Sequence, residues 1–294
     1  MEVNRNKELS QFFMLWKMKN ESNKIDWLNF ISNFSKKKSF LETLNELINE
    51  EFGQMNLFDE HYNNFLYESK KYEDLWNRHN IKSLVFDDFY LVDSLKRVKN
   101  SLFFFYVGNI KILNKSEDEL ISVIGSRKTP SKYENWIRNN VPKNKVIVSG
   151  LANGADCFAH KYSINLNNEI VVIPGVDIFT YNFNNIQEVI LRYAKSKGLI
   201  LTNIIPFSKY HSNFNYLKRN KWMAQISSET YAIFFTGQSG TLGQLYETAK
   251  LDKKIYMPKD VYNINKDFLS NHKYFNILVK KNKNIGVNNA EWFF

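Results

Sequence analysis

The chain has 294 residues, of which 44% are hydrophobic, so it can bury a sizeable core in one large domain or in two ordinary ones. It contains no apolar run long enough to cross a membrane and no signal-peptide pattern at its start, and its single cysteine, Cys157, excludes an internal disulfide and a cysteine-based zinc site. We therefore expect a cytoplasmic globular protein that carries no metal and no cofactor.

The net charge of +10 is distributed unevenly. Residues 120–260 contain 18 lysines and arginines against 9 aspartates and glutamates, whereas the rest of the chain is nearly neutral in total. A basic excess on one segment indicates a polyanionic partner. The chain has only seven arginines, and two of them, Arg127 and Arg219, lie inside motifs.

Residues 1–80 are predicted to form a small helical domain. Apolar residues recur three and four positions apart, which is the spacing of one helix face. The repeats are Leu9-Phe12-Phe13-Trp16 and the segments 27–34 and 41–48. A polar stretch at 17–24 indicates a break between helices. We attribute the aromatic stripes to core packing rather than to base stacking.

Residues 81–119 are predicted to be a connector. The runs 83–86 and 102–107 are β-like, and Gly108-Asn109 is a turn signal. We expect this segment to add one or two strands to the edge of the main sheet.

Residues 120–294 are predicted to form the principal domain, because strands and helices alternate along them. Strands are expected at 120–124, 145–149, 170–173, 199–202, 230–236 and 254–257, and helices at 133–140, 155–166, 185–197, 219–227 and 242–251. Such alternation requires crossover connections, so the fold class is α/β: a Rossmann-like, mostly parallel sheet with helices on both faces. The polar tail from residue 260 indicates no separate domain.

Three of the predicted strands run into small residues that precede a predicted helix. These turns are Gly125-Ser126, Ser149-Gly150 and the segment 236–241. Backbone N–H groups at a helix start are unpaired and lie at the positive end of the helix dipole, and glycine lets an anion approach them. Turns of this kind in one parallel sheet share a single rim, where Arg127 can fork onto phosphate oxygens.

Aromatic and cationic residues are interleaved in the segment 213–222, just before a predicted helix. This mixture suits a single nucleic-acid strand, because cations pair with phosphates and flat rings stack on unpaired bases. The alternative is a solvated helix start with Phe214 and Trp222 buried, and the residues by themselves leave both readings open.

Several enzyme classes are excluded by missing motifs. The chain has no Walker phosphate loop, no dinucleotide fingerprint and no nucleophile elbow. Cys157 and His160 are one turn apart on a helix that should face the sheet, so we read them as core residues. The five histidines are scattered singly and predict no metal site. We identify no catalytic residue.

Five motifs follow one another along residues 84–258. They are Gly125-Ser126-Arg127, Ser149-Gly150-Leu151-Ala152-x-Gly154-x-Asp156, Gly175-x-Asp177, Tyr216-x-x-Arg219-Asn220-Lys221 and Ser239-Gly240-Thr241-Leu242. In order and spacing they resemble the DprA/Smf family of DNA-processing proteins. The resemblance implies a homodimer that binds single-stranded DNA through its Rossmann-like domain and loads RecA recombinase onto strands taken up in natural transformation. It also implies a sterile-alpha-motif-like domain within residues 1–80, and we expect no winged-helix domain of the kind that some members carry.

The resemblance assigns DNA-binding positions residue by residue. They are Gly125, Ser126, Arg127, Ser149, Gly150, Asn153, Gly154, Tyr216, Arg219, Asn220, Lys221, Ser239, Gly240 and Thr241. Arg127 is expected to clamp a phosphate, Tyr216 to stack on a base and Asn220 to hold the loop. By family position, residues 230–258 are expected to form the dimer surface.

The chain departs from the usual family residues at four positions, which suggests weaker DNA binding. They are Asn153, Asn182, Asn203 and Lys221.

A competing hypothesis is a nucleoside-monophosphate phosphoribohydrolase of a related superfamily, whose phosphate turn is similar to Gly237-x-x-Gly240-Thr241. Those enzymes use a glutamate where this chain has Gln244, which cannot act as a general base. A nucleotide-sensing module is a third hypothesis, and it predicts that a mononucleotide binds better than a long strand.

Overall fold

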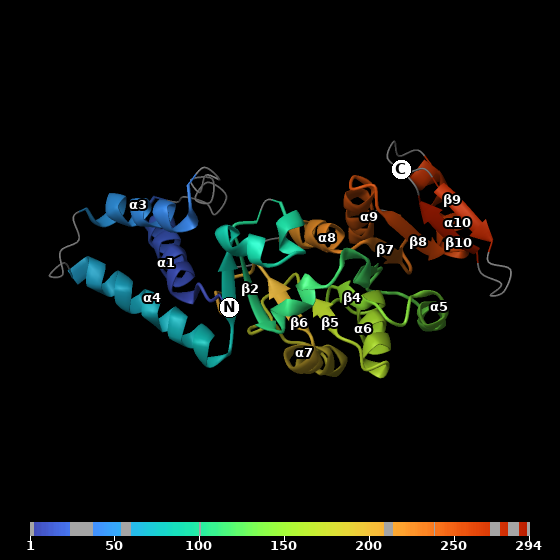
Figure 1. Cartoon of the computed structure of the whole chain (residues 1–294), viewed down its shortest axis with the longest axis horizontal. Coiled ribbons are helices and arrows are strands. Elements are labelled where there is room, and N and C mark those ends of the chain that lie inside the picture. The colour runs from blue at the N-terminus through green and yellow to red at the C-terminus, as the bar shows by residue number, and fades with distance from the viewer. Residues whose placement is uncertain are drawn as a thin grey trace. The chain divides into compact units, whose positions relative to one another are not determined.

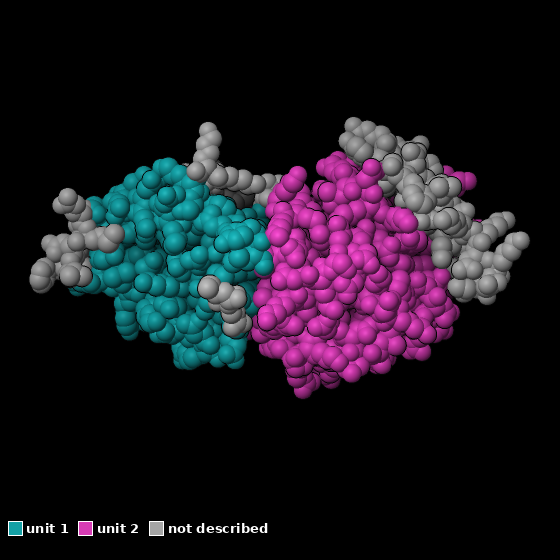
Figure 2. Space-filling view, in the orientation of Figure 1, with its two compact units in different colours: residues 1–91, 100–106 teal, residues 92–99, 107–294 magenta. Residues whose placement is uncertain are grey.

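The computed structural model describes residues 3–23, 38–53, 60–99, 101–208, 214–237, 239–270, 277–281 and 288–292. The chain divides into two compact units, coloured separately in Figure 2. Unit 1 comprises residues 1–91 and 100–106, and unit 2 comprises residues 92–99 and 107–294. The expected connector 81–119 is thus divided between the two units.

Unit 1 is built from three described helices and a hairpin. The helices are α1 (Asn6–Asn23), α3 (Phe40–Phe52) and α4 (Glu60–Arg78), and strand β1 (Lys82–Val85) pairs antiparallel with β2 (Phe103–Gly108). Helix α1 ends at Asn23, within the polar stretch 17–24 where the break is predicted. The repeat at 27–34 lies outside the described residues.

Aromatic side chains form the core of unit 1, as the sequence predicts. The ring of Phe12 lies 5.6 Å from that of Phe40 and 5.7 Å from that of Phe103. On α4, Trp76 is fully buried and meets the ring of Phe105 at 4.8 Å. The aromatic residues of the repeat on α1, Phe12, Phe13 and Trp16, are therefore core residues, whereas Tyr67 on α4 is 61% exposed.

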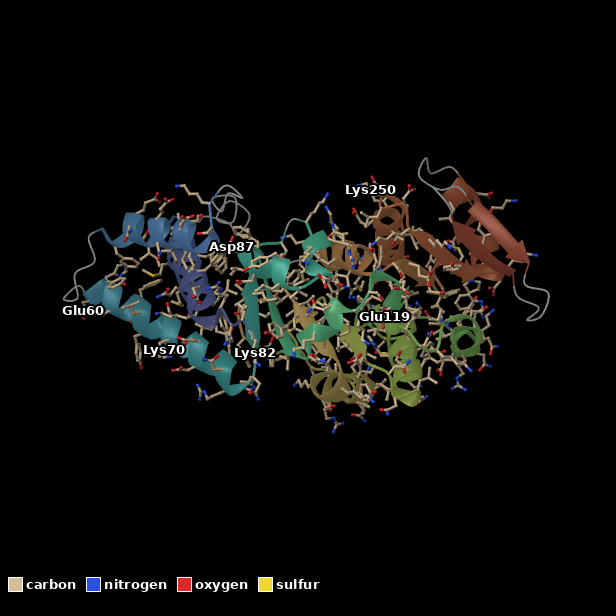
Figure 3. The ribbon with its side chains drawn as sticks, viewed as in Figure 1. Glu60, Lys70, Lys82, Asp87, Glu119 and Lys250 are labelled. Carbon is tan, nitrogen blue, oxygen red and sulfur yellow. The ribbon has the colours of Figure 1, made fainter. Side chains whose placement is uncertain are left out.

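Polar contacts fix where the helices of unit 1 begin. Ser39 and Glu42 form a capping box at the start of α3. Asp87, labelled in Figure 3, accepts a hydrogen bond of 2.6 Å from the backbone N–H of Phe40. A carboxylate at this position also complements the positive end of the helix dipole.

Unit 2 contains a mostly parallel sheet. Its described strands are β3 (Leu120–Ile124), β4 (Val146–Ser149), β5 (Ile170–Val172), β6 (Leu199–Thr202), β7 (Glu229–Ala232), β8 (Lys254–Pro258), β9 (Ile277–Lys281) and β10 (Asn288–Trp292). Their order is β6-β5-β4-β3-β7-β8-β10-β9, parallel from β6 to β8, and β10 runs antiparallel to both β8 and β9. The α/β fold class is confirmed.

Helices cover both faces of this sheet (Figure 1). Helices α5 (Lys132–Asn140), α6 (Ala155–Asn165) and α7 (Asn185–Lys197) lie along one face, and α8 (Phe214–Ile226) and α9 (Gly240–Ala249) lie along the other. Helix α10 (Lys259–Ser270) follows β8, and the tail beyond it extends the sheet through β9 and β10. No helix in the described ranges is both long and apolar enough to cross a membrane.

Two predicted boundaries are wrong, the end of strand β7 and the start of helix α8. Strand β7 ends at Ala232 instead of residue 236, although the chain stays beside β3 through a 2.7 Å hydrogen bond from Ser126 N–H to the carbonyl of Phe234. Helix α8 begins at Phe214 instead of residue 219. Tyr216 and Arg219 therefore lie one helical turn apart on the same helix.

His160 is a core residue, as predicted, and it ties α6 to the end of β4. It is fully buried, and its Nε2 donates to the carbonyl of Gly150 at 2.9 Å. Its Nδ1 has no partner among the described residues. Burial lowers the pKa of His160 from 6.5 to about 4.

The lowered pKa of His160 predicts that the stability of the folded protein depends on pH. In the unfolded chain the His160 imidazole takes up a proton near pH 6.5, whereas in the folded protein it does so only near pH 4. The contribution of neutral His160 to the free energy of unfolding is therefore complete above pH 6.5 and is lost as the pH falls towards 4. The loss is on the order of 3 kcal/mol. The free energy of unfolding, measured by urea denaturation at a series of pH values, should therefore fall more steeply towards acid pH in the parent chain than in His160→Gln. Parallel curves for the two proteins would contradict the assignment.

Candidate functional site

The three predicted turns meet at one edge of the sheet. Strands β4, β3 and β7 are neighbours, with β3 paired in parallel to β4 on one side and to β7 on the other. Parallel strands present their carboxyl ends at the same edge, so the turns that follow them come together. The predicted common rim is confirmed.

A cavity of about 420 Å³ opens at this edge, and we call it the main cavity. Its lining contains three cationic side chains, Arg127, Lys128 and Arg219, against one carboxylate, Asp156. The other lining residues are Ile124, Gly125, Ser126, Ala152, Tyr216, Asn220, Ser239, Gly240, Thr241 and Gln244. Nine of the predicted site residues are thus brought together: Gly125, Ser126, Arg127, Tyr216, Arg219, Asn220, Ser239, Gly240 and Thr241.

The start of α9 provides an open helix terminus in the main cavity. Ser239 is the N-cap residue, but its side chain makes no capping hydrogen bond. A side-chain carbon added to Gly240 would meet no atom within 4 Å, so the space above this turn is free. Asn220 Nδ2 donates to the Gly240 carbonyl at 2.9 Å and holds the turn against α8, which is the role expected for Asn220. First-turn N–H groups have no intrahelical acceptor and suit an anion.

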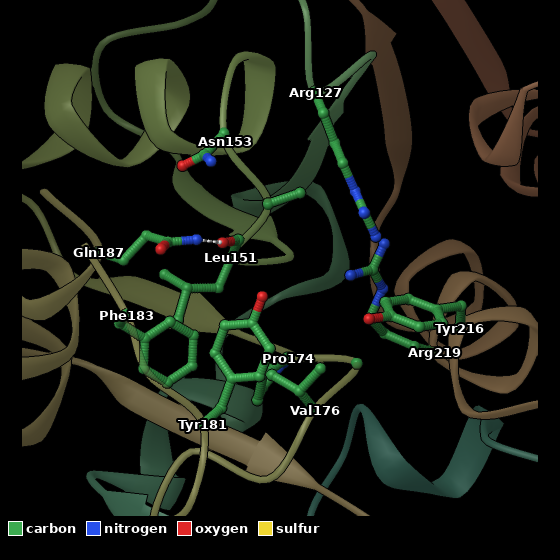
Figure 4. A pocket seen from close by; sticks show the side chains of 12 residues that line it. Arg127, Leu151, Asn153, Pro174, Val176, Tyr181, Phe183, Gln187, Tyr216 and Arg219 are labelled. Atoms are coloured by element: carbon green, nitrogen blue, oxygen red, sulfur yellow. Dashed lines mark hydrogen bonds between the residues drawn. The ribbon is translucent and has the colours of Figure 1, made fainter. Parts of the chain in front are cut away.

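Tyr216 lies close to two guanidinium groups. The guanidinium carbon of Arg127 is 5.7 Å from the centre of the tyrosine ring, and that of Arg219 is 5.6 Å from it. Figure 4 shows the three side chains side by side. The ring also rests on Gly175, where any side-chain atom would overlap it. The cation–π contacts and this glycine fix the orientation of the ring.

Asp156 holds Arg219 in place through electrostatics. A side chain on Gly150 would overlap both the Asp156 carboxylate and the Arg219 guanidinium, so the two charged groups converge on this glycine. Burial raises the pKa of Asp156, while Arg219 and a 3.1 Å hydrogen bond from Ala152 N–H oppose the rise. Burial also lowers the pKa of Arg219, but a guanidinium stays protonated at every physiological pH.

Gln244 lies at the bottom of the main cavity. Its side chain is 1% exposed, and its Nε2 donates to Ser122 Oγ at 3.0 Å. Its Oε1 has no hydrogen-bond partner among the described residues, and neither has Ser239 Oγ. These are polar atoms for which a bound molecule could supply the missing partners.

A second, smaller cavity of about 80 Å³ adjoins the first (Figure 4). Four residues line both cavities: Arg127, Ala152, Tyr216 and Arg219. The remaining lining residues of the second cavity are Leu151, Asn153, Pro174, Gly175, Val176, Tyr181, Phe183 and Gln187. Gln187 Nε2 donates to the Leu151 carbonyl at 2.6 Å and joins α7 to the loop after β4. Asn153 is the predicted residue that lies here.

Four predicted residues line neither cavity. Ser149 and Gly150 are buried beneath the site, and the Ser149 hydroxyl hydrogen-bonds to the Val123 carbonyl. Gly154 has a φ of 78° and lets the backbone of residues 126–127 approach. Lys221 projects from α8 outside both linings. That the Ser149-Gly150 turn offers backbone donors to a ligand stays a prediction, and the space beside Gly150 is filled by the Asp156 and Arg219 side chains.

Sequence reasoning missed the aromatic pair Tyr181 and Phe183. Both follow β5 in a loop with no recognisable spacing, so no periodic signal could have found them. Metal binding has no support in the described ranges, where no three histidine, cysteine, aspartate or glutamate side chains gather.

Comparison with known proteins places this geometry in a family. Residues 83–276 match the family described as DNA recombination-mediator protein A. The Smf protein of Borreliella burgdorferi is 30% identical over 183 residues, which is 60% of this chain and 54% of that protein. The chain therefore aligns with about half the length of this curated relative.

The solved structure of one DNA processing protein A shows the same fold. DNA processing protein A from Streptococcus pneumoniae superposes with a TM-score of 0.57 at 18% identity, covering 87% of each chain. DNA processing protein A from Helicobacter pylori gives a TM-score of 0.49 at 17% identity, covering 60% of this chain and 80% of that chain. Because the family match covers well over half of its residues, this chain belongs to the DNA recombination-mediator protein A family, whose members are DNA-processing proteins.

Proposed function

We propose that this protein binds single-stranded DNA at the main cavity, and that it acts in the cytoplasm as a non-catalytic mediator of recombination. In natural transformation it would protect incoming strands and load RecA onto them. The observation that carries the proposal is the Tyr216 ring held close to both Arg127 and Arg219 beside the open start of α9.

These groups match the parts of a single strand. The first turn of α9 and the exposed Arg127 side chain supply donors for a phosphate. The Tyr216 ring supplies a flat surface for an unpaired base, and base–aromatic stacking contributes about 1–3 kcal/mol. Bases in a duplex are already stacked and paired, so we expect preference for the single strand.

We further propose that the site has no hydrolytic activity. Gln244 occupies the position where the related phosphoribohydrolases have a catalytic glutamate, and an amide cannot take up a proton as a base. The one carboxylate in the lining, Asp156, is 3% exposed and engaged with Arg219 and Ala152 N–H. Incubation with AMP should release no adenine, and release above background would favour the hydrolase.

A homodimer is the proposed assembly. Strand β8 already pairs with β10, so the exposed side of α9 is the part of residues 230–258 that we expect to meet a second copy. Sedimentation velocity over a range of concentrations measures this, and a monomer throughout would exclude the dimer.

Strand binding is measured by fluorescence anisotropy of a labelled oligonucleotide titrated with protein at two salt concentrations. The same length of duplex and AMP serve as competitors. Tight, salt-dependent binding that prefers the single strand and greatly exceeds the affinity for AMP is the expected result. A higher affinity for AMP than for the strand would favour the nucleotide-sensing alternative instead.

Arg127→Ala should lower single-strand affinity at least about tenfold and reduce the salt slope by about one. The melting temperature should stay nearly unchanged, because Arg127 is exposed and forms no ion pair with any described residue. The matched control is Arg138→Ala, which removes the same charge from an exposed position on α5 that lines neither cavity. An equal loss of single-strand affinity in both variants would show that Arg127 contributes only its positive charge and not a specific phosphate contact.

Gly175→Ala should weaken binding several-fold without changing the salt slope. The added methyl group would displace the Tyr216 ring, and stacking releases no counterions. Gly243→Ala on α9 is the control, because its new methyl group would come no closer than 3.8 Å to another side chain. Unchanged affinity in Gly175→Ala would show that the ring position does not matter.

A further inference from the structure

Tyr181 presents an exposed ring in the second cavity and is not among the residues assigned above to strand binding. Its relative exposure is 50%. The ring of Phe183 lies 4.8 Å from it at an interplanar angle of 52°. Figure 4 shows the two rings next to each other, with the Tyr181 hydroxyl directed into the cavity. Phe183 supports the tyrosine from within the protein.

Asp177 anchors the loop that carries Tyr181. This aspartate is 2% exposed and accepts hydrogen bonds from the N–H groups of Phe179 at 3.0 Å and Phe207 at 2.8 Å. The Thr180 hydroxyl donates to it at 3.0 Å, and Tyr181 N–H donates to its backbone carbonyl at 3.0 Å. A ring on an anchored loop loses little conformational entropy when it binds a partner.

The position of Tyr181 fits a continuing nucleic-acid strand. The second cavity shares Arg127, Tyr216 and Arg219 with the main cavity, and no carboxylate is among its lining residues. A strand that leaves Tyr216 therefore passes two cationic side chains before it reaches Tyr181. Ring, cation and ring in succession reproduce the order of base, phosphate and base along a single strand.

We propose that Tyr181, supported by Phe183, is a second stacking subsite for an unpaired base of the strand held in the main cavity. The subsite rests on the proposed function of that cavity. A mononucleotide in the main cavity does not extend to Tyr181, whereas an oligonucleotide does. Tyr181 thus contributes to the affinity for longer strands alone.

The test compares two ligands, thymidine 5′-monophosphate and an oligothymidylate of about ten nucleotides. Tyr181→Ala should bind the oligonucleotide about tenfold more weakly and the mononucleotide unchanged. Tyr181→Phe keeps the flat ring and should retain parental affinity for both. The matched control is Tyr90→Ala, which removes a 67% exposed tyrosine from unit 1 and should change neither affinity.

If Tyr181→Ala keeps the parental affinity for the oligonucleotide while Arg127→Ala loses binding, the subsite is overturned and the proposed function stays intact. Equal weakening for both ligands would also overturn it, because it would place Tyr181 in the main site. If the parent chain binds no oligonucleotide, the proposed function fails and the subsite fails with it.

Photochemical crosslinking gives a readout that does not depend on a substitution. An oligonucleotide containing 5-iodouracil is irradiated with the parent chain, and the adduct is located by mass spectrometry. An adduct on Tyr181 supports the subsite. Adducts confined to Tyr216, with none on Tyr181 at saturating oligonucleotide, would contradict it.

Discussion

The site depends on one electrostatic attraction, that between the buried carboxylate of Asp156 and the guanidinium of Arg219 across Gly150. A charge removed from water must be compensated, and here Arg219 and the N–H of Ala152 provide the compensation. The two groups can converge only because Gly150 has no side chain between them. The attraction therefore joins the end of β4, the first turn of α6 and the middle of α8. It sets the position from which Arg219 faces Tyr216.

Glycines around the site have two different structural roles. At Gly125, Gly150, Gly154 and Gly175 the space that a side chain would need is filled by protein atoms, so these residues allow close packing of neighbouring segments. At Gly240 that space is empty and lies in the lining of the main cavity. The result is a rigid surround with one open helix terminus, which is the arrangement that an anion can use without reorganising the protein.

The two cavities form one basic surface because Arg127 and Arg219 belong to both. Five segments far apart in the chain supply it: the turn after β3, the loop after β4 with the first turn of α6, the loop after β5, the start of α8 and the start of α9. A parallel sheet gathers such segments because every strand ends at the same edge. Aromatic rings on two of these segments, Tyr216 and Tyr181, then lie on either side of the cations.

The sequence by itself determined the strands and helices of the parallel sheet, the shared rim of the turns and the family motifs, because these depend on short segments of the chain. Apolar runs and alternating periodicity predict the strands and helices of the parallel sheet, since burial of β-branched runs and amphipathic faces is a property of short segments. The shared rim of the three turns follows from strand direction alone. The family could also be recognised, because its motifs have fixed order and spacing. The residues assigned through it include most of the lining of the main cavity.

Only the tertiary structure decided which motif residues face solvent. Ser149 and Gly150 belong to the motif that follows β4, yet they are buried, because Asp156 and Arg219 converge above them. The early start of α8 places Tyr216 on the same helix as Arg219, although the sequence predicted that this helix begins only at residue 219. Tyr181 reaches the site through the Asp177-anchored loop, which has no periodicity to read. Contacts between distant segments set these positions, and spacing along the chain does not encode such contacts.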